Sequence, residues 1–232
     1  MGERLRIHEV GLRDGLQGEA VAVPTSAKLA LLRSLREAGL TSFEATSFVS
    51  PKAVPQMADA EQVMAGVASD SGARYSALVL NEKGYMRARE AGCRSVAFAW
   101  VTTEPLALRN GRMTVAEGLE ACRAVMGRAR TDDVQRRVYI APAWVCPYEG
   151  PVAEDSVLRR VEEALEAGAS EIALADTIGH ADPWSVRARC EAVGRRFGFG
   201  LLAVHLHDTQ ALGLANAVAA LESRLRAATG PW

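Results

Sequence analysis

The tripeptide Glu-Ala-Gly recurs three times, and this repeat limits the possible folds more than any other feature of the sequence. It occupies residues 37–39, 90–92 and 166–168, each time at the end of a helical pattern and shortly before an apolar run. A glycine just past a helix end is the usual left-handed stop. A strand that follows so soon afterwards predicts repeated βα units around a parallel sheet.

Periodicity extends this pattern to seven βα units over the whole chain. Runs rich in Val, Ile, Leu and Ala, typical of strands buried on both faces, predict strands at 5–10, 41–46, 73–80, 94–101, 136–143, 170–175 and 201–206. Helical spacing predicts helices at 26–38, 56–68, 82–91, 114–128, 154–167, 184–196 and 211–226.

The count and the length favour a TIM-type (β/α) barrel that occupies residues 1–232 as a single domain. A complete barrel needs eight strands, so we expect the eighth strand to be missing. An open doubly wound sheet is the alternative. No G-x-G-x-x-G or G-x-x-x-x-G-K-[ST] motif follows any strand, which argues against the nucleotide site usual in such sheets.

Charge and composition exclude several classes of function. A formal net charge of −1 leaves no excess of basic groups for nucleic acid. No apolar run approaches the roughly 20 residues of a membrane span, and the first six residues leave no room for a signal peptide. Four cysteines without a C-x-x-C pair are typical of a reducing compartment, so we expect a cytoplasmic protein.

Two histidines at the end of the seventh predicted strand are the clearest chemical signal. Residues two apart in a strand share a face, so His205 and His207 can present both imidazoles to one divalent metal. Asp14 is the best carboxylate partner, because barrel closure brings the first strand near the last ones. A structural role in a turn beside Gly15 is the alternative for Asp14.

Three further charged residues lie where packing alone does not explain them. Glu44 and Asp176 fall within apolar strands, where a carboxylate must be paired, bound to a metal or shifted in pKa. Arg13 could be a surface cation, but a guanidinium near a carbonyl would stabilise the oxyanion of an enolate-forming reaction.

The sequence resembles the DRE-TIM metallolyases, and within them the 3-hydroxy-3-methylglutaryl-CoA lyase family. The resemblance runs from about residue 5 to 222 and rests on five motifs in order. They are Gly-Leu-Arg-Asp-Gly-Leu-Gln at 11–17, the stretch 44–57, Cys-Pro-Tyr-Glu-Gly at 146–150, Asp-Thr-Ile-Gly at 176–179 and Ala-Val-His-Leu-His-Asp-Thr at 203–209.

The resemblance implies a Mg²⁺ or Mn²⁺ ion held by Asp14, His205 and His207. It also implies that Arg13 polarises a thioester carbonyl, and that Glu44, Asp176 and His205 form the proton-transfer network. The polar positions near the substrate would be Gln17, Ser47, Asn110 and Thr177, together with Arg13.

The implied reaction is a retro-Claisen cleavage of 3-hydroxy-3-methylglutaryl-CoA, or of a close relative, to acetyl-CoA and acetoacetate, as in leucine catabolism. The implied partner is a small acyl-CoA substrate, with no nucleic acid and no membrane, and we expect a homodimer.

Two departures from the family pattern qualify this expectation. Ala211 stands where the family often has glycine, and residues 223–232 do not match the family, whose members add an eighth strand, a catalytic Cys loop and an Asn ligand. Cys146 is better interpreted as a packed residue than as the missing acid. We therefore expect weak activity or none from this chain. A remnant that only binds CoA-like ligands and a synthase that condenses acetyl-CoA with a 2-oxoacid remain alternatives.

Overall fold

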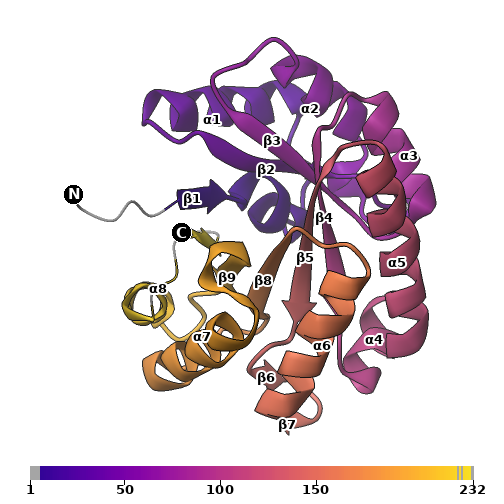
Figure 1. Cartoon of the computed structure of the whole chain (residues 1–232). Helices are drawn as coiled ribbons and strands as arrows, with labels where there is room; N and C mark the ends of the chain where they lie inside the picture. Colours follow the sequence, from indigo (N-terminus) through magenta and orange to yellow (C-terminus); the bar gives the residue numbers. More distant parts are fainter. Residues whose placement is uncertain (1–5, 224, 226, 231–232) are drawn as a thin grey trace.

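A closed barrel of parallel strands forms the centre of the protein in the computed structural model, which describes residues 6–223, 225 and 227–230 (Figure 1). The strand order around the barrel is β1-β10-β9-β8-β5-β4-β3-β2. The strands are β1 (Arg6–Glu9), β2 (Ser42–Ser47), β3 (Arg74–Val79), β4 (Ser95–Val101), β5 (Gln135–Ala141), β8 (Glu171–Asp176), β9 (Leu202–Leu206) and β10 (Ala227–Gly230). The predicted barrel is confirmed, and the open sheet is wrong.

Helices surround the barrel and connect its strands (Figure 1). They are α1 (Thr25–Glu37), α2 (Ala60–Val67), α3 (Glu82–Glu90), α4 (Glu104–Asn110), α5 (Val115–Thr131), α6 (Glu154–Glu166), α7 (Pro183–Phe197) and α8 (Gly213–Glu222). Short 3₁₀ turns lie at η2 (Pro55–Met57) and η3 (Phe199–Leu201). In the described part of the chain, no helix combines the length and the hydropathy that a membrane crossing requires.

Two local elements were not predicted from the sequence. Helix α4 spans only seven residues, and the antiparallel hairpin of β6 (Val145–Cys146) and β7 (Gly150–Pro151) only two on each side. Elements this short show too few turns or alternations for periodicity to reveal them.

The repeated Glu-Ala-Gly stops behave as predicted. Gly39, Gly92 and Gly168 have φ angles of 97°, 82° and 109°, the left-handed conformation that favours glycine. After each of them, the next residue donates its N–H to the carbonyl five positions earlier, at 3.0–3.1 Å. This bond is characteristic of a Schellman stop. Each stop turns the chain directly from a helix into the following strand.

The expectation that the eighth strand is missing is wrong. The last predicted helix ends at Glu222 instead of residue 226, and Ala227–Gly230 forms β10, which pairs with β1 on one side and β9 on the other. The segment Ala-Ala-Thr-Gly shows no apolar alternation, so its extended conformation comes from pairing with its two neighbours. In the described barrel, β10 therefore lies between β1 and β9 and closes the sheet.

Small side chains fill much of the barrel interior. A buried cluster inside the strands consists of Leu78, Ala97, Tyr139, Ala173 and Ala203. Three of the five are alanines, so the Tyr139 ring is the largest side chain of the cluster. Buried polar side chains lie near both ends of the barrel. The carboxyl end of the strands is the end at which (β/α) barrels place their chemistry.

Candidate metal site

Three predicted ligands converge at the carboxyl end of the barrel. One ligand atom each from Asp14, His205 and His207 lies within 4.8 Å of the others. The two Nε2 atoms are 2.9 Å apart, and Oδ2 of Asp14 lies 3.5 Å from His205 Nε2 and 3.2 Å from His207 Nε2. The predicted pair of imidazoles therefore faces one point in space, and Asp14 meets them there.

A single turn of π-helix places Asp14 at this point. Element η1 (Gly11–Gly15) follows β1 directly, and the Asp14 amide donates to the carbonyl of Val10 at 2.7 Å. The preceding Glu9 stabilises the start of this turn, because its carboxylate accepts a hydrogen bond from the Gly11 amide at 2.6 Å. Turns of π-helix occur often at functional sites. No helix was predicted between residues 10 and 26, and the structure shows a wound segment that brings Arg13 to Glu44 and Asp14 to the two histidines.

Arg13 joins the ligand cluster to a buried carboxylate. Its Nε donates to Glu44 Oε1 at 2.5 Å, its Nη1 bonds Asp14, and Glu44 Oε2 accepts the Tyr139 hydroxyl at 3.0 Å. Glu44 is fully buried, so its charge depends on these partners. Burial alone would lower the pKa of Arg13, but the carboxylates of Glu44 and Asp14 outweigh it and hold that pKa above its usual value.

The charges of the ligand cluster follow from the same contacts. Burial opposes the charged form of Asp14, but hydrogen bonds with His205 and His207 and the charge of Arg13 hold the pKa of Asp14 well below its usual value. Burial lowers the pKa of His205, and Asp14 only partly offsets this effect. A carboxylate beside a neutral imidazole is the protonation state that metal ligation requires.

Asp176 ends strand β8 and holds the loop that follows it. Its two carboxylate oxygens accept the backbone amides of His180 and Ala181 at 3.0 and 3.1 Å. Burial raises the pKa of this carboxyl, although the two amides oppose the shift. In the same loop Gly179 has a φ of 65°, and a Cβ there would lie 2.9 Å from the Thr209 amide nitrogen, so glycine is required. The loops after β8 and β9 are thus packed together beside the ligands.

Three predicted substrate contacts carry polar atoms that nothing in the described chain satisfies. Gln17 Oε1, Ser47 Oγ and Thr177 Oγ1 are buried and have no hydrogen-bond partner. Ser47 ends β2, and Thr177 follows β8, so both lie at the carboxyl end of the barrel. Buried polar groups without partners are rare in proteins and need an explanation. A bound polar ligand is one explanation that fits all three.

Two predictions concern residues outside this cluster. Asn110 is the exposed last residue of α4, and no contact in the described structure joins it to the ligands, so its role stays a prediction. Cys146 is buried in the hairpin with its sulfur 3.1 Å from the Thr103 hydroxyl, as a packed residue would be.

Tyr139 is the site residue that the sequence did not reveal. Its hydroxyl bonds Glu44, and its ring meets the His205 ring edge-on, with centroids 5.3 Å apart. In the sequence its strand looks like any other buried strand, so nothing there marks Tyr139 as a functional residue. Only its neighbours in space show that it supports both a predicted acid and a predicted ligand.

The donor set fits a divalent cation. Adjacent donors of an octahedral ion with bonds of about 2.1 Å lie roughly 3 Å apart, which is close to the three separations observed between Asp14, His205 and His207. Two imidazoles and one carboxylate on one side of an ion leave its other positions open for substrate. The structure therefore supports a metal site with room for a ligand.

The family match and the matches to individual relatives point to the same family. The HMGL-like family matches residues 4–227. The mitochondrial hydroxymethylglutaryl-CoA lyase of Gallus gallus is 40% identical over 95% of this chain and 74% of its own length. That of Arabidopsis thaliana is 44% identical over 94% of this chain and 47% of its own. The chain thus spans from about half to three quarters of the length of these relatives.

A solved structure agrees with both the fold and the sequence matches. An HMG-CoA lyase from Acinetobacter baumannii, in complex with coenzyme A and 3-methylmalate, matches with a TM-score of 0.92 and 35% identity, over 97% of this chain and 74% of that one. Matched relatives carry both mitochondrial and cytoplasmic names. On a family match that covers nearly the whole chain and on identities near 40%, this chain belongs to the HMGL-like family and is a homologue of the hydroxymethylglutaryl-CoA lyases, which are carbon–carbon lyases.

Proposed function

We propose that this chain cleaves 3-hydroxy-3-methylglutaryl-CoA, or a thioester with a closely similar acyl group, to acetyl-CoA and acetoacetate. The observation that carries the proposal is the convergence of Asp14, His205 and His207 beside the buried guanidinium of Arg13. Few reactions need a metal site and a fixed cation for an oxyanion at the same place, and retro-Claisen cleavage of a hydroxyacyl thioester needs both.

Asp14, His205 and His207 would hold the ion, and we propose Mg²⁺ or Mn²⁺ because a carboxylate and open positions suit these metals. When bound, such an ion makes a substrate hydroxyl more acidic and orients an adjacent carboxylate. The protein's own side chains would carry out the remaining steps.

Arg13 is placed to stabilise the negative charge that develops on the thioester oxygen. Glu44 engages its Nε and Asp14 its Nη1, which leaves Nη2 as the donor for the substrate carbonyl. When the carbon–carbon bond breaks, its electron pair passes to the acetyl-CoA fragment as an enolate, and a fixed guanidinium favours that charge. Proton transfer then completes acetyl-CoA.

We assign proton transfer to the group of Glu44, Asp176 and His205. Glu44 would act through Arg13 and Tyr139, to which it is bonded, and Asp176 through the loop that it holds against β9. His205 Nε2 belongs to the proposed ligand set and its ring meets the Tyr139 ring, so His205 links the metal site to the rest of this group.

The unsatisfied oxygens of Gln17, Ser47 and Thr177 support a polar substrate that reaches over several strand ends. Binding of coenzyme A to the Acinetobacter lyase supports an acyl-CoA for this chain as well. We also propose Asn110 as a contact to the substrate, one domain for the whole chain, a homodimer, and a cytoplasmic location. The cytoplasmic name of one relative supports the location.

The test is acetoacetate release from 3-hydroxy-3-methylglutaryl-CoA with added Mg²⁺ or Mn²⁺. Arg13→Lys keeps the charge but loses the planar fork, so we expect its kcat to fall by at least about 100-fold, as when one oxyanion donor is removed. Arg123→Lys is the matched control and should be unchanged, because among the described residues the Arg123 guanidinium pairs only with Glu120 on an exposed helix face.

Three other outcomes would contradict the proposal in different ways. Equal rates for Arg13→Lys and Arg123→Lys would remove Arg13 from the reaction. Condensation of acetyl-CoA with a 2-oxoacid, without cleavage, would identify a synthase. Saturable binding of coenzyme A with no turnover would identify a binding remnant.

A further inference from the structure

A polar cavity lies at the opposite end of the barrel from the proposed lyase site. Its wall includes the first residues of six strands, which are Arg6, Ser42, Arg74, Ser95, Gln135 and Glu171. Because the strands are parallel, these residues share the amino end, whereas Asp14 and His205 lie at the carboxyl end. Residues at the amino end of such barrels usually contribute to stability, so a binding role needs specific support.

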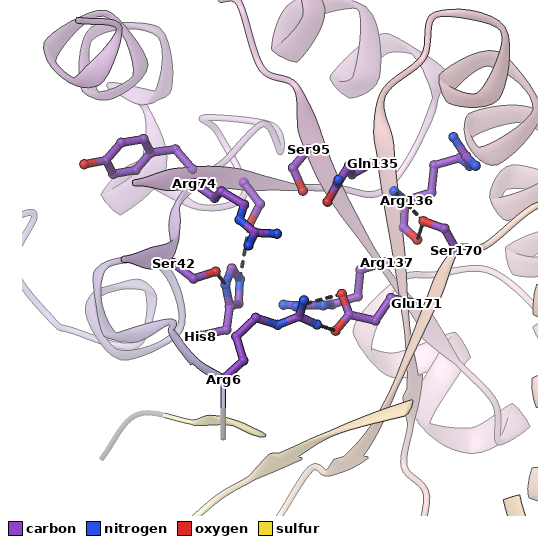
Figure 2. Close-up of a pocket in the computed structure, with 12 residues that line it drawn as sticks. Arg6, His8, Ser42, Arg74, Ser95, Gln135, Arg136, Arg137, Ser170 and Glu171 are labelled. Carbon is purple, nitrogen blue, oxygen red and sulfur yellow. Dashed lines mark hydrogen bonds and ion pairs between the residues drawn. The ribbon is translucent and has the colours of Figure 1, made fainter. Parts of the chain in front are cut away.

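The cavity carries an excess of positive charge. Four arginines line it, at positions 6, 74, 136 and 137, and Glu171 is the one acidic residue in its wall. Both oxygens of Glu171 are already engaged, Oε1 by Arg6 at 2.7 Å and Oε2 by Arg137 Nη2 at 3.1 Å. Figure 2 shows Arg6, Arg74 and Arg137 gathered around the same space, with Glu171 between two of them.

Two of these guanidinium groups keep donors that the protein does not use. Arg137 is 8% exposed, yet its Nε has no hydrogen-bond partner. The Arg74 side chain makes no hydrogen bond or ion pair with the described residues, although it stands at the edge of the same cavity (Figure 2). Arg136 differs, because its guanidinium donates to the carbonyls of Gly168 and Val134. The Arg137 donor is buried, and a buried cationic donor without a partner is costly, so its persistence calls for a ligand.

The surroundings of His8 indicate that the electrostatic potential inside the cavity is positive. It lies between two serine hydroxyls, 2.7 Å from Ser42 Oγ and 3.2 Å from Ser76 Oγ. Burial lowers its pKa well below the usual value, and the charges of Arg137 and Arg6 lower it further. The imidazole is therefore neutral, and the positive charge in the wall of this cavity is carried by its arginines.

We propose that this cavity binds a small tetrahedral oxyanion, of the phosphate or sulfate class, between Arg74 and Arg137. Guanidinium groups match the oxygens of such anions, because each can present two parallel donors. The cavity has a volume of about 40 Å³, which is room for a few water-sized groups and too little for a nucleotide. The proposal does not depend on the lyase reaction.

Calorimetric titration of the protein with inorganic phosphate, at constant ionic strength and pH 7.5, tests the proposal. We expect one saturable site that sulfate competes for, and binding at least about tenfold weaker in Arg74→Gln and Arg137→Gln, since each removes a charged donor. Arg109→Gln is the matched control, because Arg109 lies in α4 beyond the carboxyl end of β4. It should bind phosphate as the unchanged protein does.

If Arg137→Gln fails to fold, Arg74→Gln decides the question, because Arg74 is exposed and makes no hydrogen bond or ion pair with any residue that the structure describes. Unchanged binding in Arg74→Gln, no saturable heat in the unchanged protein, or weakening by Arg109→Gln alone would each overturn the site. Acetate that binds as tightly as phosphate would overturn the tetrahedral class of ligand.

Discussion

The substitution Glu44→Gln tests whether Arg13 and Glu44 form a buried ion pair on which the site depends. The amide keeps the size of the side chain and removes its charge. Glu44 is fully buried and accepts two hydrogen bonds, from Arg13 Nε at 2.5 Å and from the Tyr139 hydroxyl at 3.0 Å. An amide has one acceptor oxygen where the carboxylate has two, so one of the two donors must reorient or lose its partner.

The expected cost follows from what Arg13 retains. Removal of one partner from a buried ion pair typically costs about 3–5 kcal/mol. Arg13 still bonds Asp14, and the amide oxygen still accepts one bond, so we expect the lower end of this range, about 3 kcal/mol. For a domain of this size that corresponds to a fall in Tm of roughly 6–12 °C.

Urea unfolding followed by circular dichroism, with EDTA present so that metal binding does not contribute, measures this change. The matched control is Glu162→Gln, which makes the same replacement in an exposed pair where Arg196 donates at 2.9 Å. Exposed pairs contribute roughly 0–1 kcal/mol. If both variants lose the same small free energy of unfolding, Arg13 and Glu44 are not a desolvated pair and the reasoning about this site fails.

Three further predictions follow from separate features. His207→Ala should abolish the binding of about one divalent ion per chain; full metal content by atomic emission would remove His207 from the ligand set. Ala211 has a φ of 58°, so Ala211→Gly should raise the free energy of unfolding by about 0.5–1 kcal/mol, as the relief of a left-handed alanine exceeds the entropy gained by the unfolded chain; a lower denaturation midpoint would contradict this. Burial raises the pKa of Cys93, Cys122 and Cys190 to about 12. Unfolded thiols ionise from about pH 9 while the buried ones stay protonated. Stability should therefore fall as the pH rises from about 9 toward 12, by up to about 1.4 kcal/mol per unit for each thiol. A variant with all three changed to Ala should show a shallower fall, and an equal slope would assign the effect to other groups.

The family position of Ala211 shows how the sequence alone can mislead about energy. The replacement of a frequent glycine by alanine looks mild when only residue size is considered. The structure places this residue in the left-handed region, with its amide donating to the Asp208 carbonyl at 2.9 Å. The cost lies in the backbone, and only the coordinates of the loop reveal it.

Most of the order of helices and strands, and the convergence of Asp14, His205 and His207, could be predicted from the sequence. The three Glu-Ala-Gly stops reveal the repeat because a helix end is a local event, set by a few residues and one positive φ. His205 and His207 were found in the same way, because two positions of one strand share a face wherever that strand lies. Local rules of this kind need no knowledge of the rest of the chain.

Tertiary structure alone decided how distant segments meet. Tyr139 contacts Glu44 across 95 positions of sequence, the arginine-lined cavity gathers the first residues of six strands, and β10 is a strand because β1 and β9 pair with it on both sides. In each case the deciding factor is closure of the barrel. Closure fixes which strands are neighbours and in which register, and no short stretch of sequence contains that information.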